Sequence, residues 1–352
     1  MSGSRLPSTL HPPPSIFCGM AASSSSSPFY HVLKTQQFDR ALLDELCELT
    51  NTIRARAKTR EGRLFLRGLL ADKRSMLYFT QPSTRTFLSF NNACQLLGIQ
   101  SSEIRDASTS SEIKGESLLD SLRTFGSYVD IIVMRTKEEG LAAAAAEMFD
   151  RIPHRVPIVN AGSGKDQHPT QALLDIYTLE RSFKHRGGID GKVIGMMGDL
   201  KRGRTVRSLS YLMKVYKGVK LVFIAPPAFA MEDDIKSHLR DHGVDYVETE
   251  DMEGALPELD ALYVTRIQDE YDQGGESSKV DISKFKLGVS HLPRMKEDAV
   301  IMHPLPRRDE IHPDVDADPR AKYWRQERNG MWMRAAILVK IFGVEGEVLK
   351  PS

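Results

Sequence analysis

The segment FTQPSTRTFLSF, residues 79–90, places one arginine among three hydroxyl side chains. Directly after a proline come Ser83, Thr84, Arg85 and Thr86. Proline suits the first turn of a helix, and Ser or Thr beside it caps the free N–H groups. Such an N-terminus attracts anions, and the guanidinium of Arg85 can bind a phosphate through two parallel hydrogen bonds. The alternative is an ordinary cap beside a solvated arginine, and this segment alone does not decide between the two.

Polar residues also follow other apolar runs of the chain. Four arginines lie at the ends of predicted buried strands or shortly after them: Arg85, Arg135, Arg204 and Arg266. Comparable positions are occupied by His168, Gln171, Gln268 and the kinked run Pro304-Leu305-Pro306. In open parallel sheets, ligands bind beyond the carboxyl ends of the strands. We therefore expect these side chains to line a crevice for a substrate with several negative charges.

Strand-like and helix-like segments alternate along the chain. The predicted strands are the apolar runs 75–79, 130–135, 156–161, 192–198, 220–226, 260–266 and 299–306. Helical periodicity occupies 87–98, 117–129, 170–183, 205–218 and 329–343. Apolar strands alternating with helices indicate parallel sheets covered on both faces. The predicted fold class is α/β, with two doubly wound parallel-sheet domains and a C-terminal helix that packs back on the first domain.

The length of 352 residues is too great for one compact core and indicates two domains. The alternating pattern breaks at the polar, glycine-rich run 184–192, after the long helix that we take as a connector. We predict a leader at 1–28, a first domain at 29–169, a second domain at 170–325 that begins with the connector helix 170–183, and a closing helix at 326–345.

Composition narrows the classes of function. The net charge is +1, so the balance of charge gives no general support for binding to nucleic acid or to a membrane surface. No apolar run approaches the roughly 20 residues of a membrane span. The cysteines Cys18, Cys47 and Cys94 are scattered without zinc spacing, which favours buried thiols in a reducing compartment.

The leader 1–28 is rich in serine and proline and contains no acidic residue. Such a composition favours a disordered segment, with a translation start at Met20 as an open alternative to Met1. An organelle transit peptide is also serine-rich and acid-poor, but only Arg5 is basic here. The predicted location is therefore cytoplasmic, with a plastid as the alternative.

The motifs PSTRT, KGE, DIIVMR, NAG, HPTQ, GDLxxGRT, TRIQ and MHPLPRxDEI resemble, in order and spacing, those of the aspartate carbamoyltransferase family. The resemblance covers roughly residues 29–345. HPTQ and HPLP are similar to the aspartate enzymes, whereas ornithine carbamoyltransferases carry a cysteine-containing version of each. The resemblance implies two parallel-sheet domains of the aspartate/ornithine carbamoyltransferase type, a carbamoyl-phosphate-binding domain at 29–169 and an aspartate-binding domain at 170–325. It also implies transfer of the carbamoyl group of carbamoyl phosphate to the amino group of L-aspartate, in pyrimidine synthesis, without a cofactor or metal ion.

The resemblance also implies roles for individual residues. Ser83, Thr84, Arg85 and Thr86 would hold the phosphate, and Arg135 would bridge phosphate and carbonyl oxygens. His168 would contact the carbamoyl oxygen, while the carbamoyl amine would meet Gln171 and the carbonyls of Pro304, Leu305 and Pro306. The two carboxylates of aspartate would be held by Arg204, Arg266 and Gln268. Lys114, with Ser110 from the same loop, would reach in from the neighbouring subunit of a homotrimer; the resemblance leaves open whether a regulatory chain binds.

Three residues depart from the family pattern. Gln81 stands where many relatives have a glutamate that bridges the two domains, and Tyr271 stands where they have an arginine that pairs with it. Phe87 replaces a family arginine and is expected to pack in an apolar environment. Closure of the two domains therefore cannot use that ion pair.

Three alternatives remain beside this interpretation. A carbamoyltransferase with another amino-acid acceptor is disfavoured by HPTQ and HPLP. A nucleotide-dependent oxidoreductase is disfavoured because MMGDLKRGRT lacks the full GxGxxG pattern. A catalytically silent structural homologue would not need the arginines, the lysine and the histidine that this chain keeps.

Overall fold

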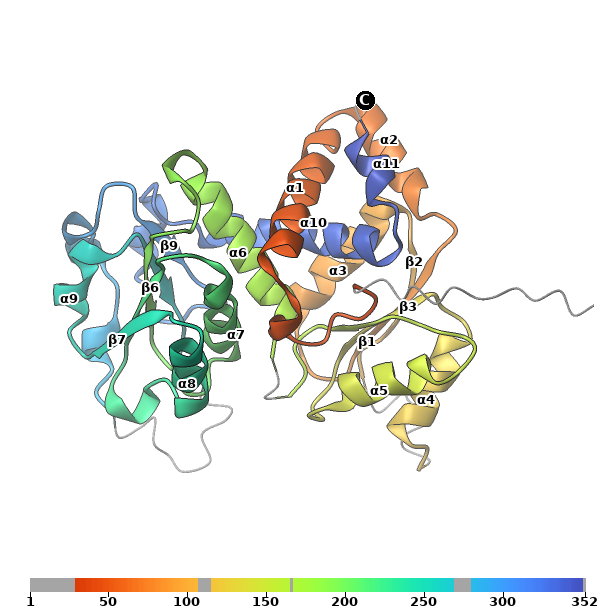
Figure 1. Cartoon of the computed structure of the whole chain (residues 1–352), viewed down its shortest axis with the longest axis horizontal. Coiled ribbons are helices and arrows are strands. Elements are labelled where there is room, and N and C mark those ends of the chain that lie inside the picture. The colour runs from red at the N-terminus through yellow and green to blue at the C-terminus, as the bar shows by residue number, and fades with distance from the viewer. Residues whose placement is uncertain (1–28, 107–114, 165–166, 269–279, 351–352) are drawn as a thin grey trace, which may run out of the picture.

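The structure is a computed structural model that describes residues 29–106, 115–164, 167–268 and 280–350. The predicted leader 1–28 lies outside the described residues, as do Ser110, Lys114 and Tyr271. The chain forms two halves joined through the centre of the molecule (Figure 1).

The first half contains a four-stranded parallel sheet in the order β2-β1-β3-β4. Its elements are α1 (Arg40–Arg56), α2 (Arg60–Leu69), β1 (Arg74–Phe79), α3 (Thr84–Leu97), β2 (Gln100–Ile104), α4 (Leu118–Gly126), β3 (Ile131–Arg135), α5 (Leu141–Asp150) and β4 (Ile158–Asn160). Helices cover both faces of this sheet (Figure 1).

The second half contains a five-stranded parallel sheet in the order β7-β6-β5-β8-β9. Its elements are α6 (Pro169–Phe183), β5 (Val193–Met197), α7 (Arg204–Leu212), β6 (Lys220–Ile224), α8 (Asp233–Asp241), β7 (Asp245–Thr249), α9 (Met252–Ala255), β8 (Ala261–Val264) and β9 (Val300–Met302). The chain ends with α10 (Tyr323–Ile341) and α11 (Glu345–Leu349).

The alternation of side chains along a strand explains why the central strands are mostly apolar. In β3, Ile131 and Val133 join one hydrophobic cluster, while Ile132 and Met134 join another on the opposite face. Successive side chains of a strand point to opposite faces, so a sheet covered on both sides needs apolar residues at every position. The α/β fold class predicted from the sequence is confirmed.

The closing helix α10 runs from the second half back across the first (Figure 1). It packs against α1, α3 and α6. Its buried side chains include Met333, Ile337 and Leu338, which belong to a hydrophobic cluster that spans both halves. The prediction that the C-terminal helix packs on the first domain is confirmed.

The structure contains two edge strands that the sequence interpretation missed. β2 and β7 lie at the outer edges of the two sheets, and most of their residues are exposed or half-buried. Their sequences, QSSEI and DYVET, carry few apolar residues, as expected for strands whose side chains stay exposed or half-buried at the margin of a sheet. The predicted strand 299–306 is shorter in the structure, where β9 ends at Met302.

The strand orders place the carboxyl ends of two strand pairs toward the space between the halves. In the first sheet the order reverses between β1 and β3, and in the second between β5 and β8. Open α/β sheets bind ligands at such reversal points. The segments that follow these strands are therefore the ones that build the candidate site.

Candidate active site

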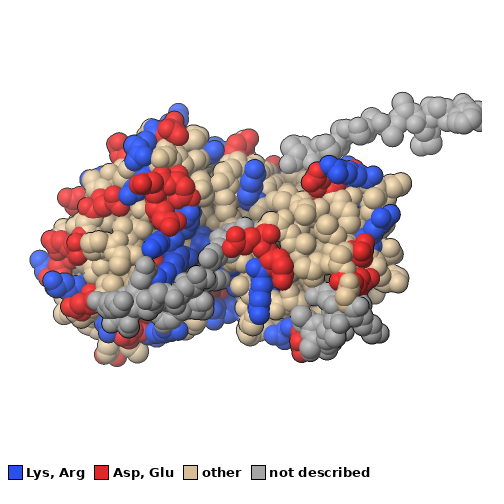
Figure 2. All heavy atoms as spheres, turned by 90° about the horizontal axis from the view of Figure 1, so that it is seen from below, with Lys and Arg blue, Asp and Glu red and all other residues tan. Residues whose placement is uncertain are grey.

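A cavity of about 350 Å³ lies between the two halves. It is lined by every predicted site residue that the structure describes: Ser83, Thr84, Arg85, Thr86, Arg135, His168, Gln171, Arg204, Arg266, Gln268, Pro304, Leu305 and Pro306. Seen from below, Lys and Arg side chains gather between the halves (Figure 2). The site residues that were predicted from the sequence to converge therefore do line one cavity, although their individual roles remain predictions.

The N-terminus of α3 opens directly into the cavity. Ser83 is the N-cap residue, but its side chain makes no capping hydrogen bond. The N–H groups of the first helical turn have no acceptor within the helix, and the helix dipole places partial positive charge there. Ser83, Thr84 and Thr86 add hydroxyls at the same place, so this end of the cavity suits a phosphate group.

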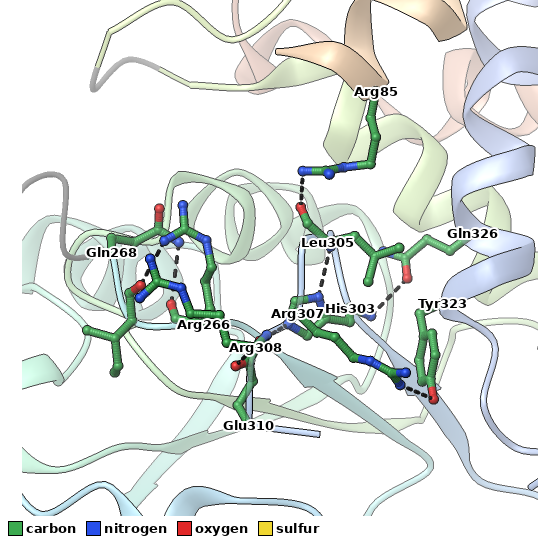
Figure 3. Close-up of polar contacts among 11 residues, drawn as sticks. Arg85, Arg266, Gln268, His303, Leu305, Arg307, Arg308, Glu310, Tyr323 and Gln326 are labelled. Atoms are coloured by element: carbon green, nitrogen blue, oxygen red, sulfur yellow. Dashed lines mark hydrogen bonds and ion pairs between the residues drawn. The ribbon is translucent and has the colours of Figure 1, made fainter. Parts of the chain in front are cut away.

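Arg85 connects this helix to the loop of the second half. Its Nη2 donates to the carbonyl oxygen of Leu305 at 2.8 Å (Figure 3). Its Nε lies 3.9 Å from Oε1 of Glu327. Burial lowers the pKa of Arg85, Glu327 opposes that shift, and the positive charge of Arg266 adds to it. Arg85 thus belongs to a cavity where positive charges face one another, as a polyanionic substrate requires.

Arg135 and His168 lie together behind the phosphate end. Arg135 ends β3 and donates to the carbonyl of Ala161 at 3.3 Å, while His168 is the N-cap residue of α6. Both side chains pack against Gly162, whose φ is +96°: a Cβ on this glycine would lie 2.7 Å from His168 Cδ2 and 3.0 Å from Arg135 Nη1. Glycine is therefore required here, both for its backbone conformation and for this close approach.

The imidazole of His168 is held neutral. Burial lowers its pKa well below the ordinary value, and the positive charges of Arg135, Arg204 and Arg334 lower it further. Its Nδ1 atom is buried without a hydrogen-bond partner among the described residues. A neutral imidazole can donate one N–H to a carbonyl oxygen and does not itself repel the surrounding arginines.

Gln171 is oriented by a buried carboxylate one helical turn further along α6. Its Nε2 donates to Oδ1 of Asp175 at 3.0 Å. The same carboxylate accepts from Gln326 Nε2 at 2.7 Å and from the Tyr263 hydroxyl at 2.9 Å. Because the Gln171 amine is engaged by Asp175, its carbonyl oxygen remains as the acceptor for an N–H donor in the cavity.

The second half supplies the opposite wall. Arg204, the first residue of α7, donates to the carbonyl of Gly162 at 2.8 Å and so reaches across to the first half. Arg266 and Gln268 follow β8; the backbone N–H of Gln268 donates to Asp199 Oδ2 at 3.1 Å. This wall carries two arginines and an amide, which are side chains that bind carboxylates.

The loop Pro304–Pro306 is positioned by His303, which is fully buried. Nδ1 of His303 accepts the Leu305 N–H at 2.8 Å, so Nε2 carries the proton that faces Glu310 Oε1 at 2.7 Å (Figure 3). Leu305 adopts a positive φ of 49°, which is unusual for a residue with a side chain. These contacts aim the Leu305 carbonyl into the cavity, where Arg85 donates to it.

Two charged residues of α10 line the cavity and were missed from the sequence. They are Glu327 and Arg334, seven residues apart and therefore on one face of the helix. Arg334 is fully buried, which lowers its pKa to about 10, and it donates to Ser89 Oγ at 2.6 Å. The seven-residue spacing of opposite charges within an apolar helix was the signal that could have revealed them. Thr205, Thr265 and His303 also line the cavity.

The residues that the structure describes contain neither a membrane-spanning helix nor a metal-binding cluster. No helix there is long and apolar enough to cross a bilayer. Nor does this part of the chain bring together three or more His, Cys, Asp or Glu side chains that could hold a metal ion.

Comparison with known proteins gives matches along nearly the whole described chain. Residues 30–181 match the family "Aspartate/ornithine carbamoyltransferase, carbamoyl-P binding domain", and residues 190–341 match its "Asp/Orn binding domain". The pea (Pisum sativum) protein named aspartate carbamoyltransferase 3, chloroplastic, is 44% identical over 313 residues, which cover 87% of this chain and 76% of the pea protein.

An archaeal protein and a solved structure extend the comparison. The aspartate carbamoyltransferase catalytic subunit of Thermococcus gammatolerans is 41% identical over 313 residues, covering 89% of this chain and 97% of that protein. The crystal structure of aspartate transcarbamoylase from Trypanosoma cruzi, in complex with carbamoyl phosphate and aspartate, is similar with a TM-score of 0.77 and 35% identity, covering 88% of this chain and 94% of that one. On these matches and the two-sheet fold with its shared cavity, the chain belongs to the aspartate/ornithine carbamoyltransferase family.

Proposed function

We propose that this chain is an aspartate carbamoyltransferase. It transfers the carbamoyl group of carbamoyl phosphate to the amino group of L-aspartate, giving N-carbamoyl-L-aspartate and phosphate for pyrimidine synthesis. The observation that carries the proposal is one cavity that gathers Arg85 and Arg135 from the first half with Arg204 and Arg266 from the second. The relatives named above carry this activity in their names, and the Trypanosoma cruzi structure was solved with both substrates.

In the first half, the N-terminus of α3 and Arg85 hold the phosphate group of carbamoyl phosphate. The carbamoyl oxygen lies toward His168 and Arg135, and the carbamoyl amine toward the carbonyl oxygens of Gln171 and the Pro304–Pro306 loop. When the amine of aspartate attacks, negative charge develops on the carbonyl oxygen. A neutral histidine N–H and a guanidinium at fixed positions stabilise that charge without having to reorganise.

In the second half, Arg204, Arg266 and Gln268 hold the two carboxylates of aspartate. No side-chain nucleophile is needed, since the substrate amine attacks directly. Catalysis then rests on holding two anionic substrates together in the correct orientation, which replaces a bimolecular encounter with a reaction inside one site. The Arg204 hydrogen bond to Gly162 crosses between the halves and so links the aspartate side to the carbamoyl side.

Assembly and location belong to the same proposal. The active site is shared in a homotrimer, where Lys114 and Ser110 reach in from the neighbouring subunit; both residues lie outside the described part of the chain. The predicted cytoplasmic location has no support in the relatives' names, because the pea relative is named chloroplastic. Location in a plastid is therefore the alternative that the relatives' names favour.

The test is formation of carbamoyl aspartate by the purified chain. The assay compares aspartate with ornithine as acceptor, and wild type with Arg85→Ala and Arg85→Lys. Loss of one preorganised donor typically lowers kcat by about 10²–10³, and lysine should recover little because it lacks the planar fork. Circular dichroism checks that each variant is folded. The proposal would be contradicted if the chain carbamoylated ornithine but not aspartate, or if Arg85→Ala kept near-normal turnover.

A further inference from the structure

A second cavity, of about 400 Å³, is lined by five cationic side chains and by no acidic residue among those described. It opens where α1, α6 and α10 pack together, and we call it the basic cavity. Its lining residues are Arg54, Thr178, Arg181, Ser182, Lys322, Arg325, Arg328 and Asn329. Such a concentration of one charge stands out in a chain whose net charge is only +1.

The geometry of two helices produces this concentration. On α10, Arg325, Arg328 and Asn329 are spaced i, i+3 and i+4, so they share one face, while Glu327 of the same helix lines the active cavity. On α6, Thr178, Arg181 and Ser182 have the same spacing. Arg54, near the end of α1, completes the wall from the first half. The two helical faces and α1 therefore present cations to one common space.

Among the described residues, no carboxylate forms an ion pair with any of these five cations. Within the described part of the chain, the guanidinium groups of Arg54, Arg325 and Arg328 have no ion pair or hydrogen bond. Arg181 donates to Asn51 Oδ1 at 2.9 Å, and Lys322 donates to the carbonyl of Pro319. Other exposed arginines of this chain do pair with acids, as Arg40 pairs with Asp190 and Arg207 with Glu232. Like charges held together without a counter-ion repel one another, and an anionic ligand would relieve that cost.

The effect of neighbouring positive charge is visible at Lys322. Burial lowers its pKa, the charge of Arg325 lowers it further, and Asp318 acts in the opposite direction. Asp318 does not neutralise the cavity, because its carboxylate forms a two-point ion pair with Arg320. The floor of the cavity is polar and buried: Asn329 Nδ2 donates to Thr178 Oγ1 at 3.0 Å.

We propose that the basic cavity is a second anion-binding site, separate from the active cavity, that takes the phosphate chain of a polyphosphate compound. Four of its five cations are arginines, whose planar guanidinium matches phosphate oxygens in pairs. A single phosphate carries about two negative charges and leaves most of the five cations unpaired, whereas a chain of two or three phosphates does not. No described lining residue is aromatic, so the site recognises the phosphate chain and not a nucleobase.

The experiment is calorimetric titration of the full chain with inorganic tripolyphosphate. The arginine-rich active cavity will take the same probe, so wild type should show two binding events. Arg85→Ala should weaken the active-cavity event, because one of the arginines that line that cavity is lost, and leave the other event unchanged. Arg325→Ala/Arg328→Ala should keep the active-cavity event and weaken the other about tenfold or more, because two charge-assisted contacts are lost. Lys58→Ala/Arg123→Ala, an equal change of charge at exposed positions outside both cavities, should change neither.

Two further arms separate the sources of the phosphate chain and the class of ligand. Arg325→Ala/Arg328→Ala should weaken the binding of adenosine triphosphate by the same factor as the binding of tripolyphosphate. Hexaglutamate should bind to wild type far more weakly than either compound. If the double variant does not fold by circular dichroism, Arg54→Ala on α1 takes its place. The proposal is overturned by a single binding event that Arg85→Ala weakens, by two events whose affinities the double variant leaves unchanged, or by hexaglutamate binding as tightly as tripolyphosphate.

Discussion

Glu327 is the one carboxylate among the described residues that line the active cavity. It lies 3.9 Å from Arg85 Nε, and its pKa is raised by burial, a shift that the charges of Arg334 and Arg85 oppose. The other charged groups nearby are Asp175, which is buried behind Gln171, and Arg266 on the opposite wall. In the absence of substrate, Glu327 thus supplies negative charge where the phosphate of carbamoyl phosphate is proposed to bind.

This position makes Glu327 a competitor of the incoming phosphate. Two negative groups facing the same arginine repel each other, so Glu327→Gln should strengthen binding of inorganic phosphate several-fold at pH 8. Calorimetry with phosphate measures the change directly. Glu347→Gln, at an exposed position of α11, is the matched control and should leave the affinity unchanged. Weaker phosphate binding in Glu327→Gln would show that the carboxylate instead holds Arg85 in its binding position.

Arg266 tests the division of the cavity between the two substrates. Arg266→Ala removes a cation from the second half only, so it should raise the KM for aspartate strongly while carbamoyl phosphate still binds with nearly unchanged affinity. Separate measurement of the two ligands distinguishes this from a general loss of the site. An equal loss of affinity for carbamoyl phosphate would contradict the assignment of Arg266 to aspartate.

At the residue level, the arginines after strands could be predicted from sequence and the charges of α10 could not. Arg135 is the last residue of β3 and Arg266 follows β8, and the rule that ligands lie at carboxyl ends identifies them without a structure. Glu327 and Arg334 lie in a helix whose apolar residues indicate only that it packs against other elements. The path of α10 across the molecule depends on its long-range contacts with α3 and α6, which the sequence does not reveal. Phe87, expected to be apolar in its surroundings, is buried against Phe79 with ring centroids 5.5 Å apart.

At the level of elements, the buried side chain of Asp175 links α6, α10 and β8. It lies on α6 and accepts hydrogen bonds from Gln326 on α10 and from Tyr263 on β8, besides Gln171 on its own helix. Burial raises its pKa to about 7, although these three hydrogen bonds act in the opposite direction. Between its ordinary pKa near 4 and this value, the folded protein holds a proton that the unfolded chain has lost. The free energy of unfolding must therefore fall as the pH rises through that window.

Asp175→Asn should remove this contribution, because asparagine does not titrate and keeps an oxygen for the two glutamine amides. The free energy of unfolding of the variant, minus that of wild type, should therefore increase from pH 5 to pH 8. Urea unfolding at the two pH values gives the difference, with the exposed Asp245→Asn as the control. The same pH dependence in wild type and Asp175→Asn would show that another group is responsible.

Element types were predictable where both faces of a strand are covered. β1 and β3 each contain four consecutive apolar residues, so their sequences identify them. The edge strands β2 and β7 are held by backbone hydrogen bonds to one neighbour, and backbone pairing leaves no side-chain pattern to detect. The central strands that position the site were therefore predictable, while the edge strands β2 and β7 required the structure.

At the level of the whole molecule, the proposed trimer divides each active site between two chains. Lys114 would come from one subunit, and Arg266 from the next. A chain with Lys114→Ala would supply a sound aspartate side and a defective loop, and a chain with Arg266→Ala the reverse. Each variant alone should be nearly inactive, since every site in its trimer carries the same defect.

Mixing the two variants distinguishes a shared site from one contained in a single chain. In any mixed ring of three, one interface joins the intact loop of one chain to the intact aspartate side of its neighbour. Random reassembly of equal amounts should therefore restore about one quarter of wild-type activity, because three quarters of the rings are mixed and each has one sound site in three. Native mass spectrometry verifies the mixed rings. If verified mixed rings stay inactive, or if Lys114→Ala alone is fully active, then the site is not shared through Lys114.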